Sequence, residues 1–277
     1  MKKYLKNLTD EDNPKFVTDI CELSFWSAPF GMTLLNTIKL KWKIKVLDIG
    51  CGTGFPLLEL SGRLGDSSKI YGIDTSSKAI ETATEKISFY EITNAEALVA
   101  TAEKLPFENN IFDLIVSNNG INNVQDLDKT LSECFRTLKP CGQFVFTYNL
   151  PETMSEFYNV FKSALEELGL LKEIQKLHDH IFEKRKPVDY MEKIVMKSGL
   201  KIKEIIKSKF NYRFTDGISF FSYPMIRYRF VPPWKKILPE QRVEEVFTLL
   251  ENKLNEVSSK KGELVMTIPY VCFDCYK

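Results

Sequence analysis

Three alternating glycines, Gly50, Gly52 and Gly54, are the residues of this chain best suited to hold a ligand, and an acid stands on either side of them. Glycine lacks a Cβ, so a loop built from it can turn sharply and bring its backbone against a ligand. Asp48 precedes the first glycine by two positions, and Asp74 follows the last by 20. An acid at that distance can accept hydrogen bonds from both hydroxyls of a ribose. The pattern predicts a site for a ligand that contains a nucleoside.

The spacing of the glycines separates this loop from the fingerprint of dinucleotide-binding proteins. That fingerprint places a glycine three residues after its second one, and here Phe55 stands at that position. The loop is therefore expected to bind something other than a dinucleotide.

Short apolar segments alternate with helical ones, and they must position this loop. We expect strands at 46–49, 69–73, 97–100, 112–117 and 143–148, and helices at 56–64, 76–92 and 127–138. Either Ser76 or Ser77 should cap the second of these helices. Short apolar strands separated by helices are typical of a parallel sheet covered on both faces. Ligands of such sheets bind at the carboxyl ends of the strands, where the glycine loop falls.

The flanking segments are expected to add helices and two more strands. Residues 14–40 predict two short helices, separated where Pro29 and Gly31 interrupt the pattern. After Pro151 we expect helices at 152–168, 171–183, 190–196 and 240–255, strands at 201–210 and 263–272, and an irregular aromatic segment at 220–234. The predicted fold class is α/β, a doubly wound, mostly parallel seven-stranded sheet with helical lid insertions.

Composition bounds the class of partner. The 277 residues are 44% hydrophobic, and 38 Lys+Arg against 37 Asp+Glu leave a net charge of only +1. A protein whose main partner is bulk nucleic acid or an anionic membrane would be expected to carry a basic excess, although a small local patch is compatible with this balance. No secretory signal and no apolar run long enough to span a bilayer are visible. Six scattered cysteines predict reduced thiols in a cytoplasmic protein, at Cys21, Cys51, Cys134, Cys141, Cys272 and Cys275.

Further motifs follow the glycine loop, and their order along the chain is characteristic. Residues 71–76 close the second expected strand, residues 102–107 and 112–118 follow as a turn and a strand, and residues 138–143 form the turn before the fifth strand. Together with residues 46–54 this series resembles the class I S-adenosylmethionine-dependent methyltransferases, and within them the small-molecule group (methyltransferase type 11-like). The resemblance implies a Rossmann-like fold, S-adenosyl-L-methionine as cofactor and S-adenosyl-L-homocysteine as product.

The resemblance also implies roles for the residues of the loop. Asp48 would orient the loop and the amino group of the methionine part, and the backbone at Gly50 and Gly52 would line that part. Cys51 and Gly54 belong to the same cofactor-binding loop. Cys51 is expected to fill a slot for a small residue and not to act as a nucleophile.

The remaining cofactor contacts are implied at the ends of the neighbouring strands. Asp74 would hold the ribose with Thr75 beside the adenine, the turn at Ala102 and Glu103 would meet the adenine edge, and Asn118 would lie beneath the sulfonium and amino groups. The sequence departs from the family at Thr101, where relatives often carry an aspartate that accepts from the adenine amino group. A threonine hydroxyl in that place puts the contact in question.

The whole chain, 1–277, is expected to form a single methyltransferase domain with residues 46–150 as its cofactor-binding core. Segments 14–40, 152–183 and 215–257 would be additions that cover the substrate. The aromatic residues of these segments are candidates for the wall of a substrate pocket: Trp26, Phe30, Tyr223 and Tyr228, and also Phe25. As pocket residues they indicate an apolar or planar acceptor. The alternative, that they only close the hydrophobic core, is equally common.

Methyl transfer requires few catalytic groups from the protein. Methyl transfer is an in-line displacement, so the protein supplies alignment and exclusion of water, and a base only where the O, N, S or C acceptor must lose a proton. No catalytic residue is assigned. His178 and His180, two positions apart on an expected helix, face different sides, so neither is preferred as a base. Cys272 and Cys275 lack a second pair, and no metal site is expected.

Other readings stay open beside a small-molecule methyltransferase. A nucleic-acid amino-methyltransferase should show Asn/Asp-Pro-Pro-aromatic after the fourth strand, where this chain has residues 117–120 without proline, and protein substrates are similarly disfavoured. An aminopropyltransferase should carry several acids there, and only Asp126 and Asp128 follow. A catalytically silent module that binds S-adenosylmethionine is compatible with every motif. The methyl acceptor and the oligomeric state are left open.

Overall fold

The computed structural model describes residues 2–5 and 26–277. The chain divides into two compact units, each described by itself. Within the described residues, the sheet unit comprises 26–149, 186–208 and 270–277, and the helical unit comprises 2–5, 150–185 and 209–269. The expectation of one domain with substrate-covering segments at 14–40, 152–183 and 215–257 stays a prediction.

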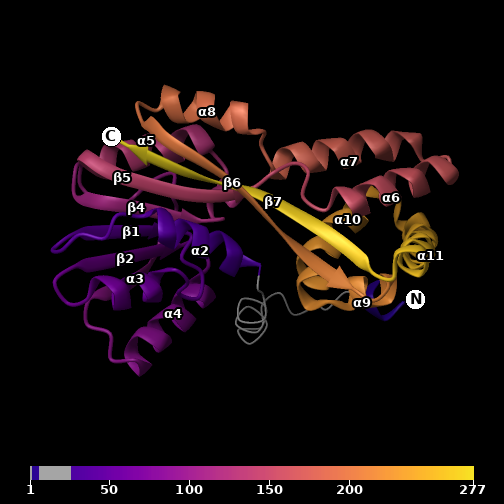
Figure 1. The fold of residues 1–277 in the computed structure, drawn as a ribbon, viewed down its shortest axis with the longest axis horizontal. Coiled ribbons are helices and arrows are strands. Elements are labelled where there is room, and N and C mark those ends of the chain that lie inside the picture. The colour runs from indigo at the N-terminus through magenta and orange to yellow at the C-terminus, as the bar shows by residue number, and fades with distance from the viewer. Residues whose placement is uncertain (1, 6–25) are drawn as a thin grey trace. The chain divides into compact units, whose positions relative to one another are not determined.

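A mostly parallel sheet is the frame of the protein (Figure 1). Within the described residues it has seven strands in the order β3-β2-β1-β4-β5-β7-β6, and β7 runs antiparallel to β5. The strands are β1 (Lys45–Ile49), β2 (Lys69–Asp74), β3 (Ala95–Val99), β4 (Phe112–Asn118), β5 (Leu138–Asn149), β6 (Lys201–Phe214) and β7 (Leu264–Tyr276). The predicted doubly wound α/β fold is confirmed.

The strand order fixes where a ligand can bind. From β1 the chain proceeds to β2 and β3 on one side of the sheet and then returns to β4 and β5 on the other. The switch point therefore lies between β1 and β4, and crevices at the carboxyl ends of the strands open at such points. The glycine loop follows β1 directly, at this switch point.

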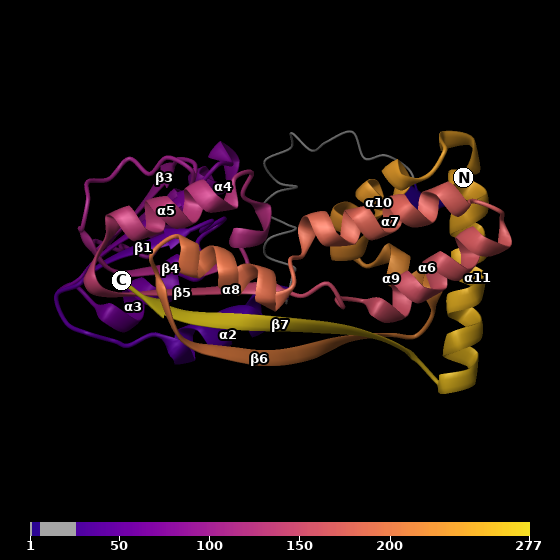
Figure 2. The same cartoon turned by 90° about the horizontal axis from the view of Figure 1, so that it is seen from above.

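Helices cover both faces of the sheet unit. Figure 2 shows α5 (Leu127–Thr137) and α8 (Val188–Lys197) on one side of the strands, and α2 (Ser27–Thr37) and α3 (Leu57–Leu64) on the other. The remaining helix of this part, α4 (Ser77–Phe89), begins at Ser76, whose hydroxyl accepts a hydrogen bond from the backbone N–H of Ala79. Ser76 is thus the cap, one of the two candidates named by the sequence.

The predicted break at Pro29 and Gly31 is wrong. Helix α2 runs without interruption from Ser27 to Thr37. Pro29 falls in the first turn of the helix, where its missing N–H would have no partner in any case. Gly31 is there for packing, since a Cβ on it would lie 2.3 Å from the Phe55 ring. Of the first expected helix, the part before residue 26 lies outside the described residues.

The helical unit contains α6 (Ser155–Glu167), α7 (Leu171–Lys184), α9 (Gly217–Ser222), α10 (Val231–Ile237) and α11 (Val243–Lys261). The irregular segment expected at 220–234 is wrong, because α9, a π-helical turn η3 (Ile226–Phe230) and α10 occupy it. Phe220, Phe221 and Trp234 are fully buried there. Burial of these rings favours helix over the local propensity of a proline-rich segment, and the prolines of α10 fall in its first turn.

None of the helices in the described part of the chain is long and apolar enough to cross a membrane.

A buried polar cluster ties three parts of the helical unit together. The hydroxyl of Tyr158 in α6 accepts a hydrogen bond of 3.1 Å from Nε1 of Trp234 and bonds of 3.3 and 3.4 Å from the two Nη atoms of Arg185. All three side chains are buried. Buried donors that lose their acceptor cost free energy, so this single hydroxyl stabilises the unit.

We expect Tyr158→Phe to lower the free energy of unfolding by about 1–3 kcal/mol, because it leaves the donors of Trp234 and Arg185 buried without an acceptor. Chemical denaturation followed by circular dichroism measures the change. Tyr276→Phe, which removes a hydroxyl from a partly exposed ring, is the control and should leave stability unchanged. Equal stabilities for wild type and Tyr158→Phe would contradict the role of the hydroxyl.

Candidate functional site

The glycine loop is held tightly against the end of β2. The backbone N–H groups of Gly50 and Cys51 both donate to the carbonyl of Ile73, at 2.8 and 3.0 Å. Gly50, Gly52 and Gly54 have φ angles of +74°, +54° and +115°. These are conformations that residues with a Cβ rarely adopt, which is why glycine recurs at every second position.

Two of the glycines also show what surrounds the loop. A Cβ on Gly50 would lie 3.1 Å from the Cα of Gly120, so the segment after β4 passes close to the loop. A Cβ on Gly52 would meet no atom within 4 Å. The loop therefore lies against protein at Gly50 and faces open space at Gly52, where a ligand has room.

Asp48 is the most unusual group of the site. It stands near the end of β1, fully buried, and neither oxygen of its carboxyl group has a hydrogen-bond partner among the described residues. Burial raises the pKa of Asp48 from 3.8 to about 8, and the negative charge of Asp74 adds to the rise. The backbone N–H of Leu57 opposes the rise, although it does not meet the geometry of a hydrogen bond. At neutral pH the carboxyl group is mostly protonated and lacks the cationic partner that a buried carboxylate requires.

Asp74 is partly exposed and joins the loop to helix α4. Its Oδ2 accepts from the backbone N–H of Gly52 at 3.1 Å, and its Oδ1 accepts from the backbone N–H of Ser76 at 2.9 Å. Each oxygen of a carboxylate can accept more than one hydrogen bond, so both oxygens retain capacity for a ligand. The backbone N–H of Ala100 donates to the carbonyl of Asp74 at 3.1 Å, which brings the end of β3 beside it.

The residues predicted to lie at the adenine directly follow β2 and β3. Thr75 and Thr101 are exposed, and Ala102 is buried. Glu103 faces elsewhere, because its Oε1 accepts from the backbone N–H groups of Gln125 and Asp126 at 2.8 and 3.3 Å. Any contact of Glu103 with an adenine must therefore use its backbone or its second carboxylate oxygen.

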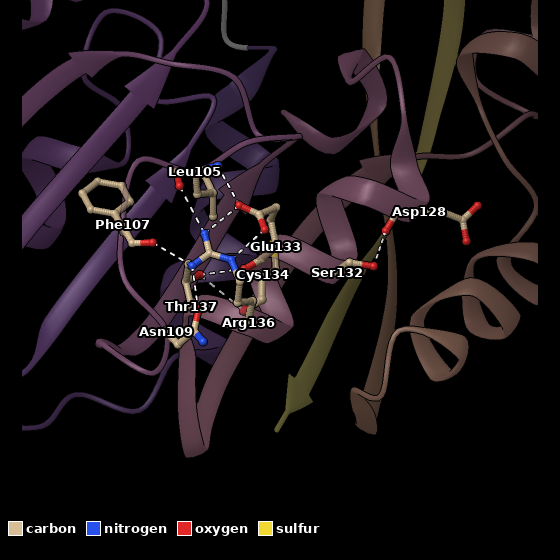
Figure 3. Close-up of polar contacts among 9 residues, drawn as sticks. All are labelled: Leu105, Phe107, Asn109, Asp128, Ser132, Glu133, Cys134, Arg136 and Thr137. Carbon is tan, nitrogen blue, oxygen red and sulfur yellow. Dashed lines mark hydrogen bonds and ion pairs between the residues drawn. The ribbon is translucent and has the colours of Figure 1, made fainter.

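An arginine in α5 holds the loop that continues from this turn (Figure 3). Arg136 donates to the carbonyls of Leu105 and Phe107 at 3.1 and 2.7 Å. Glu133 pairs with Arg136 at 2.7 Å and accepts from the backbone N–H of Leu105 at 2.8 Å. The hydrogen bond from Arg136 lowers the pKa of Glu133, which keeps the pair ionised. The residues after Glu103 are thus fixed by charge-assisted hydrogen bonds.

Asn118, at the end of β4, links three elements of the sheet unit. Its Nδ2 donates to the carbonyl of Ser27 at the start of α2, and its Oδ1 accepts from the hydroxyl of Thr147 in β5, both at 3.1 Å. A Cβ on Gly31 would lie 3.2 Å from Asn118 Nδ2 and 2.3 Å from the Phe55 ring. The structure therefore brings together α2, the glycine loop and the end of β4.

Cys51 contributes its backbone to the loop and its side chain to the core. The thiol packs against β2, where a Cβ on Gly72 would lie 2.8 Å from Sγ. Burial raises the pKa of the Cys51 thiol. A thiol that is buried and protonated is a poor nucleophile, in agreement with the expected space-filling role.

The aromatic candidates fall in different units. Trp26 and Phe30 belong to the sheet unit, with ring centroids 5.8 Å apart, and Phe30 also lies 4.6 Å from Tyr270. Tyr223 lies 5.5 Å from Tyr212 in the helical unit, and the Tyr228 ring lies 5.4 Å from the guanidinium of Arg227. Phe25 lies outside the described residues. The pocket role of all four described residues stays a prediction.

Sequence reasoning missed a group of asparagines beside the site. Nδ2 of Asn122 donates to Oδ1 of Asn119, at 2.7 Å, and to Oδ1 of Asn149. Asn119 and Asn122 follow the carboxyl end of β4, and Asn149 is the last residue of β5. The four asparagines in residues 118–123 were the signal that could have found the first two. Ser27 carried no signal, because it contributes only its carbonyl.

These residues fit the cofactor that the sequence implies. Asp48 offers a buried, unpartnered carboxyl group to a positively charged amino group, Gly52 leaves open space beside the loop, and Asp74 keeps acceptor capacity for ribose hydroxyls. No residue described at the loop contradicts the fit.

The raised pKa of Asp48 predicts a pH-dependent stability. Between pH 3.8 and about 8 the carboxyl group is ionised in the unfolded chain but protonated in the folded one, so the free energy of unfolding falls as pH rises. Asp48→Asn removes this effect. We expect its stability gain over wild type to grow from about pH 4 to pH 8 and then to level off.

Denaturation in a series of buffers measures that gain. The exposed Asp66→Asn serves as the control, and its difference from wild type should not follow this course. Parallel stability curves for wild type and Asp48→Asn would contradict the burial of an unpaired carboxyl group.

Comparison with known proteins places the chain in a family. The profile of a methyltransferase domain family matches residues 40–209. The demethylmenaquinone methyltransferase of Bacillus mycoides is 33% identical over 113 residues, which are 41% of this chain and 48% of that protein. The chain thus matches only about half the length of such curated relatives.

Solved structures share the fold. The YcgJ protein of Bacillus subtilis has a TM-score of 0.57 and 18% identity, over 90% of this chain and 98% of that one. Phosphoethanolamine N-methyltransferase 2 of Haemonchus contortus, in complex with S-adenosyl-L-methionine, has a TM-score of 0.57 and 17% identity, over 96% and 57%. The sheet, the loop at its switch point and the family match agree: the chain belongs to the methyltransferase domain family, on the fold of class I S-adenosylmethionine-dependent methyltransferases.

Proposed function

We propose that this protein transfers the methyl group of S-adenosylmethionine to a small-molecule acceptor. The observation that carries the proposal is Asp48, a fully buried carboxyl group without a partner beneath a glycine loop that is open at Gly52. A folded protein retains such a costly group where a ligand satisfies it.

The cofactor, when bound, supplies a methyl carbon already activated by a positive sulfur. The work of this chain is to bind and to align. Asp48 would ionise to pair with the amino group of the methionine part, and Asp74 would accept from the ribose hydroxyls. Gly50 and Gly52 would let the backbone approach, and Asn118 holds the start of α2 beside them.

Two observations support an acceptor of low molecular weight. Several curated relatives are named demethylmenaquinone methyltransferase, so a quinone-type ring is the first acceptor to try. The net charge of +1 gives no general attraction for nucleic acid. Trp26 and Phe30 lie on or beside α2, whose start Asn118 ties to β4, and we propose them as part of the acceptor wall.

We expect Asp74→Ala to weaken the binding of S-adenosylmethionine roughly ten- to a hundredfold, the cost of losing hydrogen bonds to a charged acceptor. Isothermal titration calorimetry measures the affinity. Asp74→Ala also removes the acceptor for the backbone N–H of Ser76, and this disturbs the start of α4. Ser76→Ala is the matched control, because it disturbs the same helix start by removing the side-chain cap and leaves the carboxylate of Asp74 in place. An Asp74→Ala affinity equal to that of Ser76→Ala would sink the assigned ribose contact.

Methyl transfer is tested with S-adenosylmethionine labelled in its methyl group. Purified protein is incubated separately with a metabolite extract, a demethylated quinol, total RNA and a protein extract. We expect label in the small-molecule samples, and loss of that transfer in Asp74→Ala. Label found only in RNA or protein would overturn the small-molecule proposal. Tight binding of the cofactor without any transfer would instead identify a silent binding module.

A further inference from the structure

The segment that joins α2 to β1 exposes an unusual alternation of side chains. Residues 39–45 place lysine at every second position, at Lys39, Lys41, Lys43 and Lys45, and all four lysines are exposed. Between them Leu40 is 56% exposed and Trp42 is 87% exposed. We call residues 39–45 the basic tip.

The basic tip is held in place by its backbone. The backbone N–H of Lys39 donates to Oε1 of Gln143 at 2.9 Å, and those of Lys43 and Ile44 donate to the hydroxyls of Ser67 and Ser68 at 3.4 and 3.3 Å. Ile38, just before the tip, and Ile44, within it, are buried. These two isoleucines anchor the tip, while its fixed backbone presents Leu40 and Trp42 to the outside.

The charge around the tip is positive. None of its four lysines forms an ion pair with another described residue. Two acids near the tip, at the start of β4 and near the end of β7, are already neutralised, because Asp113 pairs with Lys139 at 2.8 Å and Asp274 pairs with Lys203 at 2.7 Å. Lys69 adds a further positive charge opposite Lys45 in the register of β1 and β2, and the neighbouring turn carries the exposed Asp66.

We propose that the basic tip docks this protein on an anionic lipid surface, with Leu40 and Trp42 inserted at the level of the headgroups and the lysines against lipid phosphates. Tryptophan and lysine are the residues that favour a membrane interface, since the indole ring is amphipathic and the lysine stem is apolar. The net charge of +1 excluded a general basic excess, and the attraction here is local.

A single-stranded nucleic acid is the less suitable partner for this surface. Proteins that bind such strands stack successive bases on several aromatic side chains along a groove. The basic tip offers one aromatic ring, and its second apolar residue is an aliphatic leucine. Lipid therefore matches the composition of the tip better than nucleic acid does.

The basic tip lies away from the candidate site. It ends at Lys45, the first residue of β1, and the glycine loop follows β1, so the two stand at opposite ends of the same strand, about 17 Å apart along its five residues. Substitutions in the tip therefore leave the cofactor residues untouched. This separation makes the proposal testable independently of the methyl acceptor.

Tryptophan fluorescence of the full chain tests the insertion. Of the three tryptophans, Trp26 and Trp234 are buried, so Trp42 reports on the surface. We expect its emission to shift to shorter wavelength with vesicles of mixed phosphatidylcholine and phosphatidylglycerol, and not with phosphatidylcholine alone. The shift should diminish at high salt, because salt screens the lysines. No shift with either kind of vesicle would overturn the proposal.

Vesicle sedimentation of variants tests the residues. Lys39→Gln with Lys41→Gln should lower vesicle affinity roughly 25-fold, about fivefold for each lysine. Leu40→Ser with Trp42→Ser should abolish sedimentation. The controls are Lys260→Gln with Lys261→Gln, two exposed lysines at the end of α11, and Leu171→Ser, which is 67% exposed; both should bind as wild type does.

Two results would overturn the assignment. Equal losses in the control variants would show that the tip has no special role. Tight binding of single-stranded RNA through the same lysines, without sedimentation by vesicles, would assign the tip to nucleic acid.

Discussion

A carboxyl group that is buried without a partner dominates the physics of this site. Asp48 lies at the end of a central strand, and removing its charge from water raises its pKa to about 8. Without a cationic partner, the buried group costs stability at neutral pH. A ligand cation beside Asp48 would pair with its ionised carboxylate and offset this cost. The neighbouring residues leave room for such a ligand and offer it further contacts.

These residues lie at the carboxyl ends of neighbouring strands. The glycines after β1 adopt positive φ angles, and at Gly52 they leave room beside the loop. Asp74 at the end of β2 fixes that loop through the N–H of Gly52, and Asn118 at the end of β4 holds the first turn of α2. Each contact depends on the parallel order of β2, β1 and β4, which places these ends together.

Most of this frame was predictable from the sequence, because local patterns determine it. Short apolar runs located the strands, and the spacing of Gly50, Gly52 and Gly54 identified the loop. The errors have tertiary causes. Gly31 and Pro29 indicated a break in α2, yet the close approach of Phe55 explains the glycine, and the first turn accommodates the proline. The aromatic segment 220–234 became helical because its rings are buried, which no local signal announces.

The site was predictable as a set of residues and less so as a set of contacts. Glu103 accepts hydrogen bonds from the backbone of Gln125 and Asp126, and Asn118 donates to the backbone carbonyl of Ser27. These contacts depend on backbone positions, which side-chain types do not encode. The central claim is that a ligand cation ionises Asp48, and calorimetry at neutral pH in buffers of different protonation enthalpy measures it directly. Binding of S-adenosylmethionine should release about one proton in wild type and none in Asp48→Asn. Equal proton release in the two proteins would contradict the account.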